Sequence, residues 1–292
     1  MFLMSEAQIL VEETEYTPYF DALELLKKQY HIVPSNSSNL FRPSINDYTK
    51  TMSDIQRDDE SRKSFFALKS NPCNPTGVTW TGPQLKSLVE TFLEEGRGAL
   101  FDEAYEFFHE SPDSALRYIP DIDKTNIFVV SAATKGLQAP GLRVGWAIAS
   151  KKNIELLRNY SSIGMGGVAR PSQICVASLL ELERVSLSRK AIAQFYGSQR
   201  QRYGRELARL GFQLYTGDGG FYHWAKLPLS LTAEEFNKRL FAHEAAILPG
   251  TLCDMLRRGE ASPHSCFVRF SFGPLPSSSF EKDIQIIESC LH

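Results

Sequence analysis

The sequence predicts an α/β protein with a mostly parallel sheet in a larger first domain and a smaller α+β domain after it. Short β-rich apolar runs alternate with helical patterns through the first half of the chain. Two of these runs, Gly98–Asp102 and Ile127–Ser131, are apolar almost throughout, as expected for strands that are covered on both faces. Beyond about residue 150, long helical patterns dominate. We therefore expect a large domain over residues 1–160 and a small domain over residues 161–292.

The first domain is predicted to contain six strands separated by helices. The strands are expected at Ile9–Val11, His31–Val33, Ser64–Leu68, Gly98–Asp102, Ile127–Ser131 and Arg143–Ala149. Apolar residues at helical spacing predict helices over Pro18–Lys28, Asn46–Arg57 and Pro83–Glu95. Because Asp102 and Ser131 end apolar runs, we expect both at the carboxyl edge of the sheet, where open α/β sheets bind ligands.

The second domain is predicted to be richer in helix. Helices are expected over Lys151–Ser161, Ser172–Arg184 and Ala191–Leu210, with a last one from Ser279. Short strands are expected at Phe221–Leu227 and Cys266–Phe272. The glycine-rich segment Ser162–Gly167 is the best candidate for a hinge between the domains.

Composition excludes several classes of function. The chain has 292 residues, of which 42% are hydrophobic and 23% charged, as in ordinary globular proteins. Its 32 Lys+Arg nearly balance 34 Asp+Glu, which argues against a nucleic-acid partner or an anionic membrane surface. No apolar run approaches the ~18 residues of a membrane span, and Met1 to Glu6 lack the features of a secretory signal. With five cysteines and no C-x-x-C pair, a reduced, cytoplasmic protein is expected.

Four clusters carry residue types suited to chemistry. They are Ser70–Gly77 (SNPCNPTG), Phe101–Tyr105 (FDEAY), Ser131–Lys135 (SAATK) with Gly141–Trp146 (GLRVGW), and Phe267–Gly273 (FVRFSFG). In the first, two Asn-Pro pairs and a glycine indicate a rigid turn that holds the Asn74 side chain. In the last, Arg269 stands in an apolar strand, where a charge needs a ligand carboxylate or a structural acid.

Competing motifs are absent. There is no G-x-x-x-x-G-K-[ST] phosphate loop and no G-x-S-x-G elbow. His243-Glu244 begins a zinc-protease signature, but Ile247 occupies the position of its second histidine. We predict no metal site.

The four clusters, in this order and at these spacings, resemble the class I/II aminotransferases, which depend on pyridoxal 5'-phosphate (PLP) and have fold type I, that of aspartate aminotransferase. Gly219–Trp224 and Leu248–Thr251 are also similar to segments of that family's small domain. The resemblance runs from about Ile9 to the C-terminus. It implies a fold type I large domain with a mixed, mostly parallel sheet, followed by a small α+β domain.

The resemblance assigns roles to individual residues. Lys135 would form the Schiff base with PLP and move a proton. Asp102 would keep the pyridine nitrogen protonated, while Asn74 and Tyr105 would hydrogen-bond the phenolic oxygen of the ring. Lys135, Asp102 and Tyr105 are thus the expected catalytic residues. Expected cofactor contacts are Tyr16 (stacking on the ring), Asn74, Asp102, Tyr105, Ser131, Thr134, Lys135 and Arg143 (phosphate).

The implied reaction moves an amino group between an α-amino acid and a 2-oxo acid. Arg269, with Asn74, would bind the α-carboxylate of the substrate through a planar fork. Acidic-substrate members carry a further arginine where this chain has Gly164 to Gly167, so a dicarboxylate substrate is not supported; Arg170 is read as a surface residue. A homodimer is implied. A lyase, decarboxylase or oxidase of the same fold shares all these motifs.

Two features depart from the family pattern. The family's segment before Ile9, on the order of a hundred residues, is expected to be absent, and with it the backbone turn that binds the phosphate. Ala132 stands where the family has a phosphate-binding serine, so Ser131 or Thr134 is the expected substitute. A truncated, non-catalytic remnant is therefore the alternative to an active enzyme.

Overall fold

The computed structural model describes residues 7–59, 61, 64–228 and 231–291. The prediction that Met1 to Glu6 form no secretory signal lies outside these residues. Within them, none of the helices is both long and apolar enough to cross a membrane.

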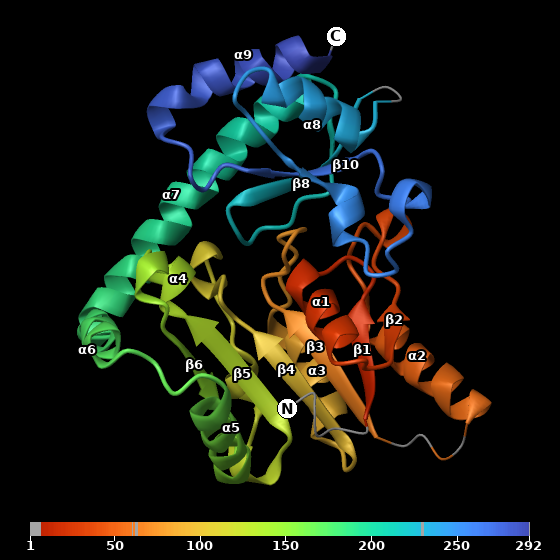
Figure 1. Cartoon of the computed structure of the whole chain (residues 1–292), viewed down its shortest axis with the longest axis vertical. Helices are drawn as coiled ribbons and strands as arrows, with labels where there is room; N and C mark the ends of the chain where they lie inside the picture. The colour runs from red at the N-terminus through yellow and green to blue at the C-terminus, as the bar shows by residue number, and fades with distance from the viewer. Residues whose placement is uncertain (1–6, 60, 62–63, 229–230, 292) are drawn as a thin grey trace.

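The large sheet has six strands in the order β2-β1-β3-β4-β5-β6 (Figure 1). The strands are β1 (Gln8–Glu12), β2 (Tyr30–Val33), β3 (Phe65–Ser70), β4 (Arg97–Asp102), β5 (Ile127–Ala132) and β6 (Gly145–Ile148). Strands β1 to β5 pair in parallel and β6 pairs antiparallel with β5. The predicted mostly parallel sheet is confirmed. Strand β6 begins later than predicted because Arg143 has a left-handed backbone (φ 52°) that no strand can contain.

Helices cover both faces of this sheet, as expected for parallel strands. On one face α2 (Ile45–Asp58) and α3 (Gly82–Leu93) bury side chains such as Tyr48 and Leu88 against the strands. On the other, α1 (Thr17–Leu25) and α5 (Lys151–Gly164) pack Leu23 and Leu157 against alternate strand residues. A short helix, α4 (Ala133–Gly136), follows β5 directly at the carboxyl edge of the sheet.

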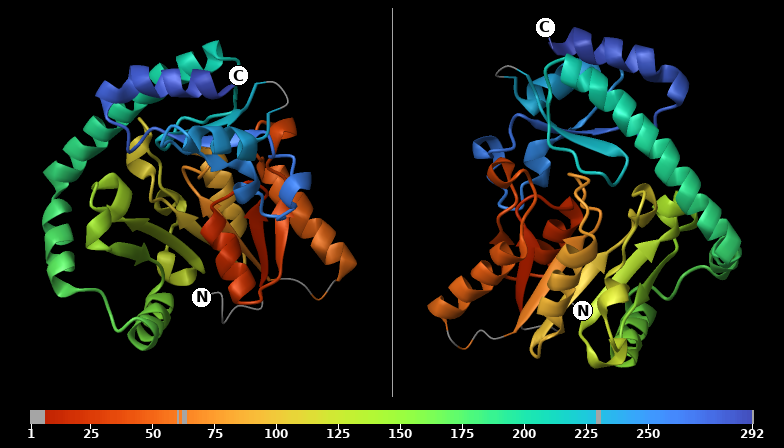
Figure 2. Two further views of the ribbon diagram at one scale, coloured as in Figure 1. Left: turned by 45° about the horizontal axis from the view of Figure 1, so that its top comes forward. Right: turned by 180° about the vertical axis from the view of Figure 1, so that it is seen from behind.

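The second half forms a small antiparallel sheet with helices on one side. Its strand order is β7-β8-β10-β9, with β7 (Gln213–Leu214), β8 (Tyr222–Lys226), β9 (Leu248–Pro249) and β10 (Phe267–Ser271). Helices α8 (Ala233–Phe241) and α9 (Phe280–Leu291) and the C-terminal part of α7 (Leu182–Arg209) supply its core. Figure 2 shows α7 running along the outside, from beside the large sheet to the small one.

Two helix predictions for this half were wrong. The helix predicted over Ser172–Arg184 is divided, because α6 (Arg170–Leu179) ends before Leu180 and α7 begins at Leu182. The predicted break between this helix and the next, at residues 185–190, is absent, since α7 runs through these residues. Helix α8 was not predicted, although Thr232 and Glu235 form the capping box that begins it.

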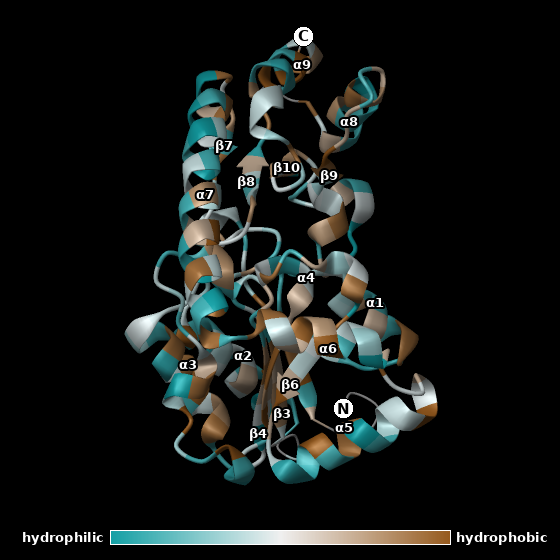
Figure 3. Ribbon diagram, turned by 90° about the vertical axis from the view of Figure 1, so that its left-hand side faces the viewer, coloured by the Kyte–Doolittle hydropathy of each residue, from teal (hydrophilic) through white to brown (hydrophobic). Residues whose placement is uncertain are grey.

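Apolar side chains are exposed along the helices that join the two halves. Ile163, Met165 and Leu182 are 90%, 73% and 87% exposed, and Ile174 and Leu187 are also largely exposed. Figure 3 views the molecule from the side of α5 and α6, where hydrophobic segments are visible on both helices. This surface belongs to α5, α6 and the first half of α7, and we call it the α5–α7 surface.

Candidate functional site

A cavity of about 860 Å³ lies at the carboxyl edge of the large sheet, facing strand β10 of the small one. Eight of the nine predicted site residues line it: Tyr16, Asn74, Asp102, Tyr105, Thr134, Lys135, Arg143 and Arg269. They come from both halves of the chain, so the site depends on how the two sheets pack together.

Asp102 ends β4, opposite Ser70 at the end of β3. One carboxylate oxygen accepts a hydrogen bond from the Tyr19 hydroxyl (2.9 Å) and the other from the Ala104 amide (3.0 Å). Burial raises the pKa of Asp102, and these two donors act in the opposite direction. The carboxyl group is thus held by two hydrogen bonds at the carboxyl edge of the sheet, where it lines the cavity.

Tyr19 was missed by the sequence analysis. A signal existed: the helix predicted from Pro18 places Tyr19 in its first turn, close to Tyr16. In the structure the two rings pack edge to face at 5.5 Å, and Tyr16 is 38% exposed toward the cavity. The same turn therefore supplies a ring for the cavity and a donor for Asp102.

Asn74 and Arg269 connect the two halves of the protein. The Asn74 side chain is buried, and its carbonyl oxygen accepts a hydrogen bond from Arg269 Nη1 at 2.7 Å. The peptide bonds before Pro72 and Pro75 are both cis. Among the described residues, the buried Nε of Arg269 has no hydrogen-bond partner. A guanidinium with a spare donor in a cavity is suited to bind a carboxylate.

Lys135 lies in α4 with its amine beside aromatic rings. Its Nζ is 5.6 Å from the centre of the Tyr105 ring and 5.2 Å from that of Phe221. Burial lowers the pKa of Lys135, and the positive charges of Arg269 and Arg143 lower it further. Burial also raises the pKa of Tyr105 to about 12. The amine is the one primary amine lining the cavity within the described chain, and its environment makes it easier to deprotonate than an exposed lysine.

Arg143 and Thr134 lie at the open side of the cavity. The Arg143 side chain is exposed and donates from Nη1 to the Pro140 carbonyl at 3.1 Å. Thr134 precedes Lys135 in α4 and also lines the cavity. Both could contact an anionic group that enters from solvent.

Ser131 does not reach this cavity, contrary to the expectation. It lines a neighbouring cavity of about 410 Å³ with Glu103 and Glu106. Its hydroxyl donates weakly to the Glu103 carbonyl and to Glu106 Oε1, both at 3.4 Å. Successive side chains of a strand point to opposite faces, so Ala132 lines the first cavity and Ser131 the second.

Other lining residues were not predicted. Ser70 and Phe221 belong to motifs identified in the sequence, so their proximity could have been foreseen. Phe108 and Tyr196 are brought in by a 3₁₀ turn and by α7, and no sequence signal indicated them.

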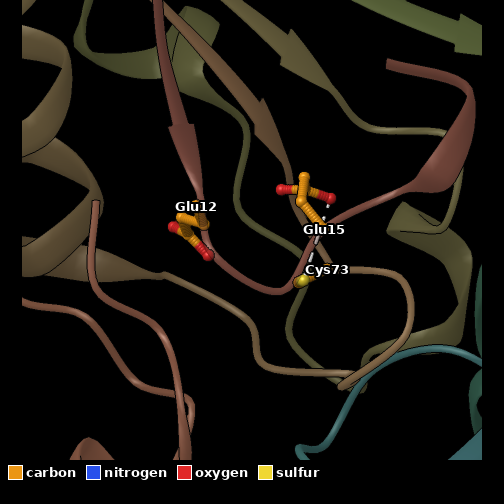
Figure 4. Close-up of side chains that lie close together, drawn as sticks. All are labelled: Glu12, Glu15 and Cys73. Carbon is orange, nitrogen blue, oxygen red and sulfur yellow. Dashed lines mark hydrogen bonds between the residues drawn. The ribbon is translucent and has the colours of Figure 1, made fainter. Parts of the chain in front are cut away.

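A buried charge network lies directly behind the cavity. Lys69 Nζ is 2.7 Å from Glu12 Oε1, and both side chains are fully buried. Figure 4 shows Glu12, Glu15 and Cys73 close together at the end of β1 and in the loop that follows β3. The potential ligand atoms of these three residues lie within 4.8 Å of one another. The Lys69 ammonium already supplies a positive charge here, and burial raises the pKa of Cys73, so we interpret the cluster as an ion-pair network.

Glu15 connects this network to the cavity. Its carboxylate accepts hydrogen bonds from the Tyr16 amide (2.8 Å), the Ser70 amide (3.3 Å) and the Ser70 hydroxyl. The Ser70 hydroxyl in turn accepts one from the Asn74 amide at 3.3 Å. Glu15 therefore positions the backbone of Tyr16 and, through Ser70, that of Asn74.

Comparison with known proteins agrees with this architecture. A family model described as "Aminotransferase class I and II" matches residues 1–277. Among curated proteins, the chain is 26% identical over 249 residues to the LL-diaminopimelate aminotransferase of Azobacteroides pseudotrichonymphae, covering 80% of this chain and 58% of that protein. It is 23% identical over 255 residues to the aspartate aminotransferase of Pyrococcus abyssi, covering 86% and 63%. The chain thus spans about 60% of the length of these two relatives.

Solved structures share the fold. The aspartate aminotransferase of Thermus thermophilus with maleate matches with a TM-score of 0.82 at 19% identity, covering 99% of this chain and 71% of that one. The aromatic aminotransferase of Pyrococcus horikoshii matches with a TM-score of 0.83 at 20% identity, covering 99% and 76%. The predicted fold type I is therefore confirmed.

The buried position of Glu15 predicts a pH dependence of stability. Burial raises the pKa of Glu15 to about 7 from an ordinary 4.5, with Lys69 opposing the shift. Between these values the folded chain holds a proton that the unfolded chain releases, so Glu15 contributes stability below about pH 4.5 that is lost as the pH rises through 7. In this range the free energy of unfolding falls by up to about 1.4 kcal/mol for each unit by which the pH rises. Urea unfolding of wild type and Glu15→Gln at pH 5, 6 and 7 should show a smaller decline in the variant.

Comparing the wild type with Glu15→Gln cancels the contributions of other buried groups that titrate in this pH range, among them Glu103 and His223. Glu24→Gln, an exposed position in α1, is the matched control and should leave the wild-type profile unchanged. Parallel profiles for wild type and Glu15→Gln would contradict this account of the network.

Proposed function

The chain belongs to the aminotransferase class I and II family, and from this we propose that it is a PLP-dependent enzyme that transfers an amino group between an α-amino acid and a 2-oxo acid. The observation that carries the proposal is the convergence of Lys135, Asp102 and Arg269 on one cavity. The proposal also places the site between two domains, residues 1–160 and 161–292, the second of which supplies Arg269. The free cysteines and near-neutral charge support a cytoplasmic location.

The residues present fit PLP. Lys135 is the amine that would hold the cofactor covalently, and its lowered pKa suits that role. Asp102, fixed by Tyr19 and Ala104, would face the pyridine nitrogen, and the Tyr16 ring would lie against the pyridine ring. Arg143 and Thr134 would contact the phosphate. When bound, PLP supplies an electron sink for the negative charge that develops at the substrate Cα.

The remaining residues would bind and orient the substrate. Arg269, which lines the cavity, would hold the α-carboxylate through its guanidinium group. Asn74 holds the guanidinium in place through its carbonyl oxygen, and Glu15 and Ser70 support Asn74 from behind. Lys135 would then be free to carry a proton to and from the substrate Cα. A lyase, decarboxylase or oxidase of this fold would use the same residues. Among the described residues, none favours one of these reactions over amino-group transfer.

The first prediction concerns Lys135. Purified protein mixed with PLP should develop an absorption band in the visible that Lys135→Ala lacks, because alanine provides no amine to hold the cofactor. Lys151→Ala, an exposed lysine at the start of α5, is the control and should retain the band. The same band in Lys135→Ala would refute the assignment.

The second prediction concerns Arg269. Arg269→Lys replaces a planar fork by a single ammonium, so the affinity for amino acid should fall by about 2–4 kcal/mol while the visible PLP band persists. Titrating the PLP-loaded protein with amino acids and following the band measures the effect. An unchanged amino-acid affinity would exclude Arg269 from substrate binding.

We further propose a homodimer in which a second copy covers the α5–α7 surface. Exposed apolar side chains gathered on successive helices often mark a protein–protein interface, and this surface extends to the site because α7 also supplies Tyr196 to the cavity. The family's usual dimeric assembly supports a dimer.

The dimer can be tested by placing a charge on this surface. Leu182→Glu combined with Ile163→Glu should shift the protein from dimer to monomer in sedimentation velocity, because burying an unpaired carboxylate is costly. Phe241→Glu, which changes an exposed residue of α8, is the control and should leave the sedimentation coefficient unaltered. A wild-type protein that sediments as a monomer would disprove the proposal.

A further inference from the structure

We propose that the site accepts amino acids with an uncharged, apolar side chain, aromatic ones included, and rejects those with a second carboxylate. This inference rests on the proposed function and specifies its substrate class. Two observations carry it: how the positive charges around the cavity are used, and the kind of side chains that form the remaining wall.

The described residues that line the cavity include three cationic side chains, Lys135, Arg143 and Arg269. Under the proposed function all three are already engaged, because Lys135 holds the cofactor, Arg143 contacts its phosphate and Arg269 binds the α-carboxylate. No further cation in the described lining remains to pair with a second carboxylate of the substrate. A dicarboxylate would therefore bring a charge that meets no opposite charge there.

Phe108, Tyr196 and Phe221 form an aromatic wall in the part of the cavity that is not assigned to the cofactor, and the uncharged polar residues Gln138 and Ser271 also line the cavity. The ring centres of Phe108 and Tyr196 are 4.9 Å apart, and Phe221 lies 5.2 Å from Phe108 and 5.9 Å from Tyr196. Phe221 also contacts the Tyr105 ring at 5.5 Å and lies 5.2 Å from Lys135 Nζ. The wall is thus adjacent to the amine that would move the proton.

The wall has one polar side-chain atom, the Tyr196 hydroxyl oxygen. The Tyr196 hydroxyl donates to the Gly273 carbonyl at 3.4 Å, across the cavity rim. A substrate side chain that packs against this wall would therefore contact mainly aromatic carbon atoms. Apolar and aromatic groups gain from burial against such a surface, whereas a carboxylate loses its hydration there without a compensating hydrogen bond.

The test compares two unreactive carboxylates, 3-phenylpropanoate and succinate, as ligands of the PLP-loaded protein. Each supplies one carboxylate for Arg269; the first adds a phenyl ring and the second a further carboxylate. Isothermal titration calorimetry should give 3-phenylpropanoate an affinity at least about tenfold higher. Tyr196→Ala should weaken 3-phenylpropanoate severalfold and leave succinate nearly unchanged. Should that variant fold poorly, Phe221→Leu, which removes ring area and keeps an apolar residue, serves the same purpose.

The outcomes separate this inference from the function on which it rests. Succinate binding as tightly as 3-phenylpropanoate, while the visible PLP band is present, would overturn the substrate class alone. A Tyr196→Ala variant that weakens both ligands equally would also count against the aromatic wall. If no PLP band forms with wild-type protein, the proposed function fails and this inference falls with it.

Discussion

The buried ion pair between Lys69 and Glu12 is the constraint on which the geometry of the site depends. Glu12 ends β1, Lys69 stands next to the end of β3, and these strands are paired neighbours. Removing one partner would leave an unpaired charge in the core, at a cost of about 3–5 kcal/mol. The two strand ends are thereby held together, and the chain leaves them directly toward Tyr16 and Asn74.

From that point the site is built by a chain of hydrogen bonds that crosses the molecule. The Ser70 hydroxyl donates a hydrogen bond to Glu15 and accepts one from the backbone N–H of Asn74. The Asn74 side-chain carbonyl then accepts a hydrogen bond from Arg269 of the small sheet. A substrate carboxylate on Arg269 would thus be located relative to the large sheet, although the arginine belongs to β10. The hydrogen bond between Asn74 and Arg269 explains how a site divided between two sheets can keep one geometry.

Sequence patterns were sufficient where the determining interaction is local. Apolar runs indicated buried parallel strands, and a polar residue at the end of such a run placed Asp102 at the carboxyl edge of the sheet. They failed where the direction of a side chain depends on its exact position in a strand, or where a residue is placed by a contact with a distant part of the chain. Ser131 was expected in the site, but strand alternation turns it away. Tyr196 enters from α7, far along the chain from Lys135, and the pairing of Lys69 with Glu12 depends on strand order.

Under the proposed function, Lys135 is the residue that would hold PLP in this cavity. The most direct measurement is borohydride reduction of the PLP-loaded protein, followed by proteolysis and mass spectrometry of the labelled peptides. The account predicts that the phosphopyridoxyl label lies on the peptide containing Lys135, in near-stoichiometric amount. Label distributed over exposed lysines such as Lys151, or concentrated on any lysine other than Lys135, would contradict it.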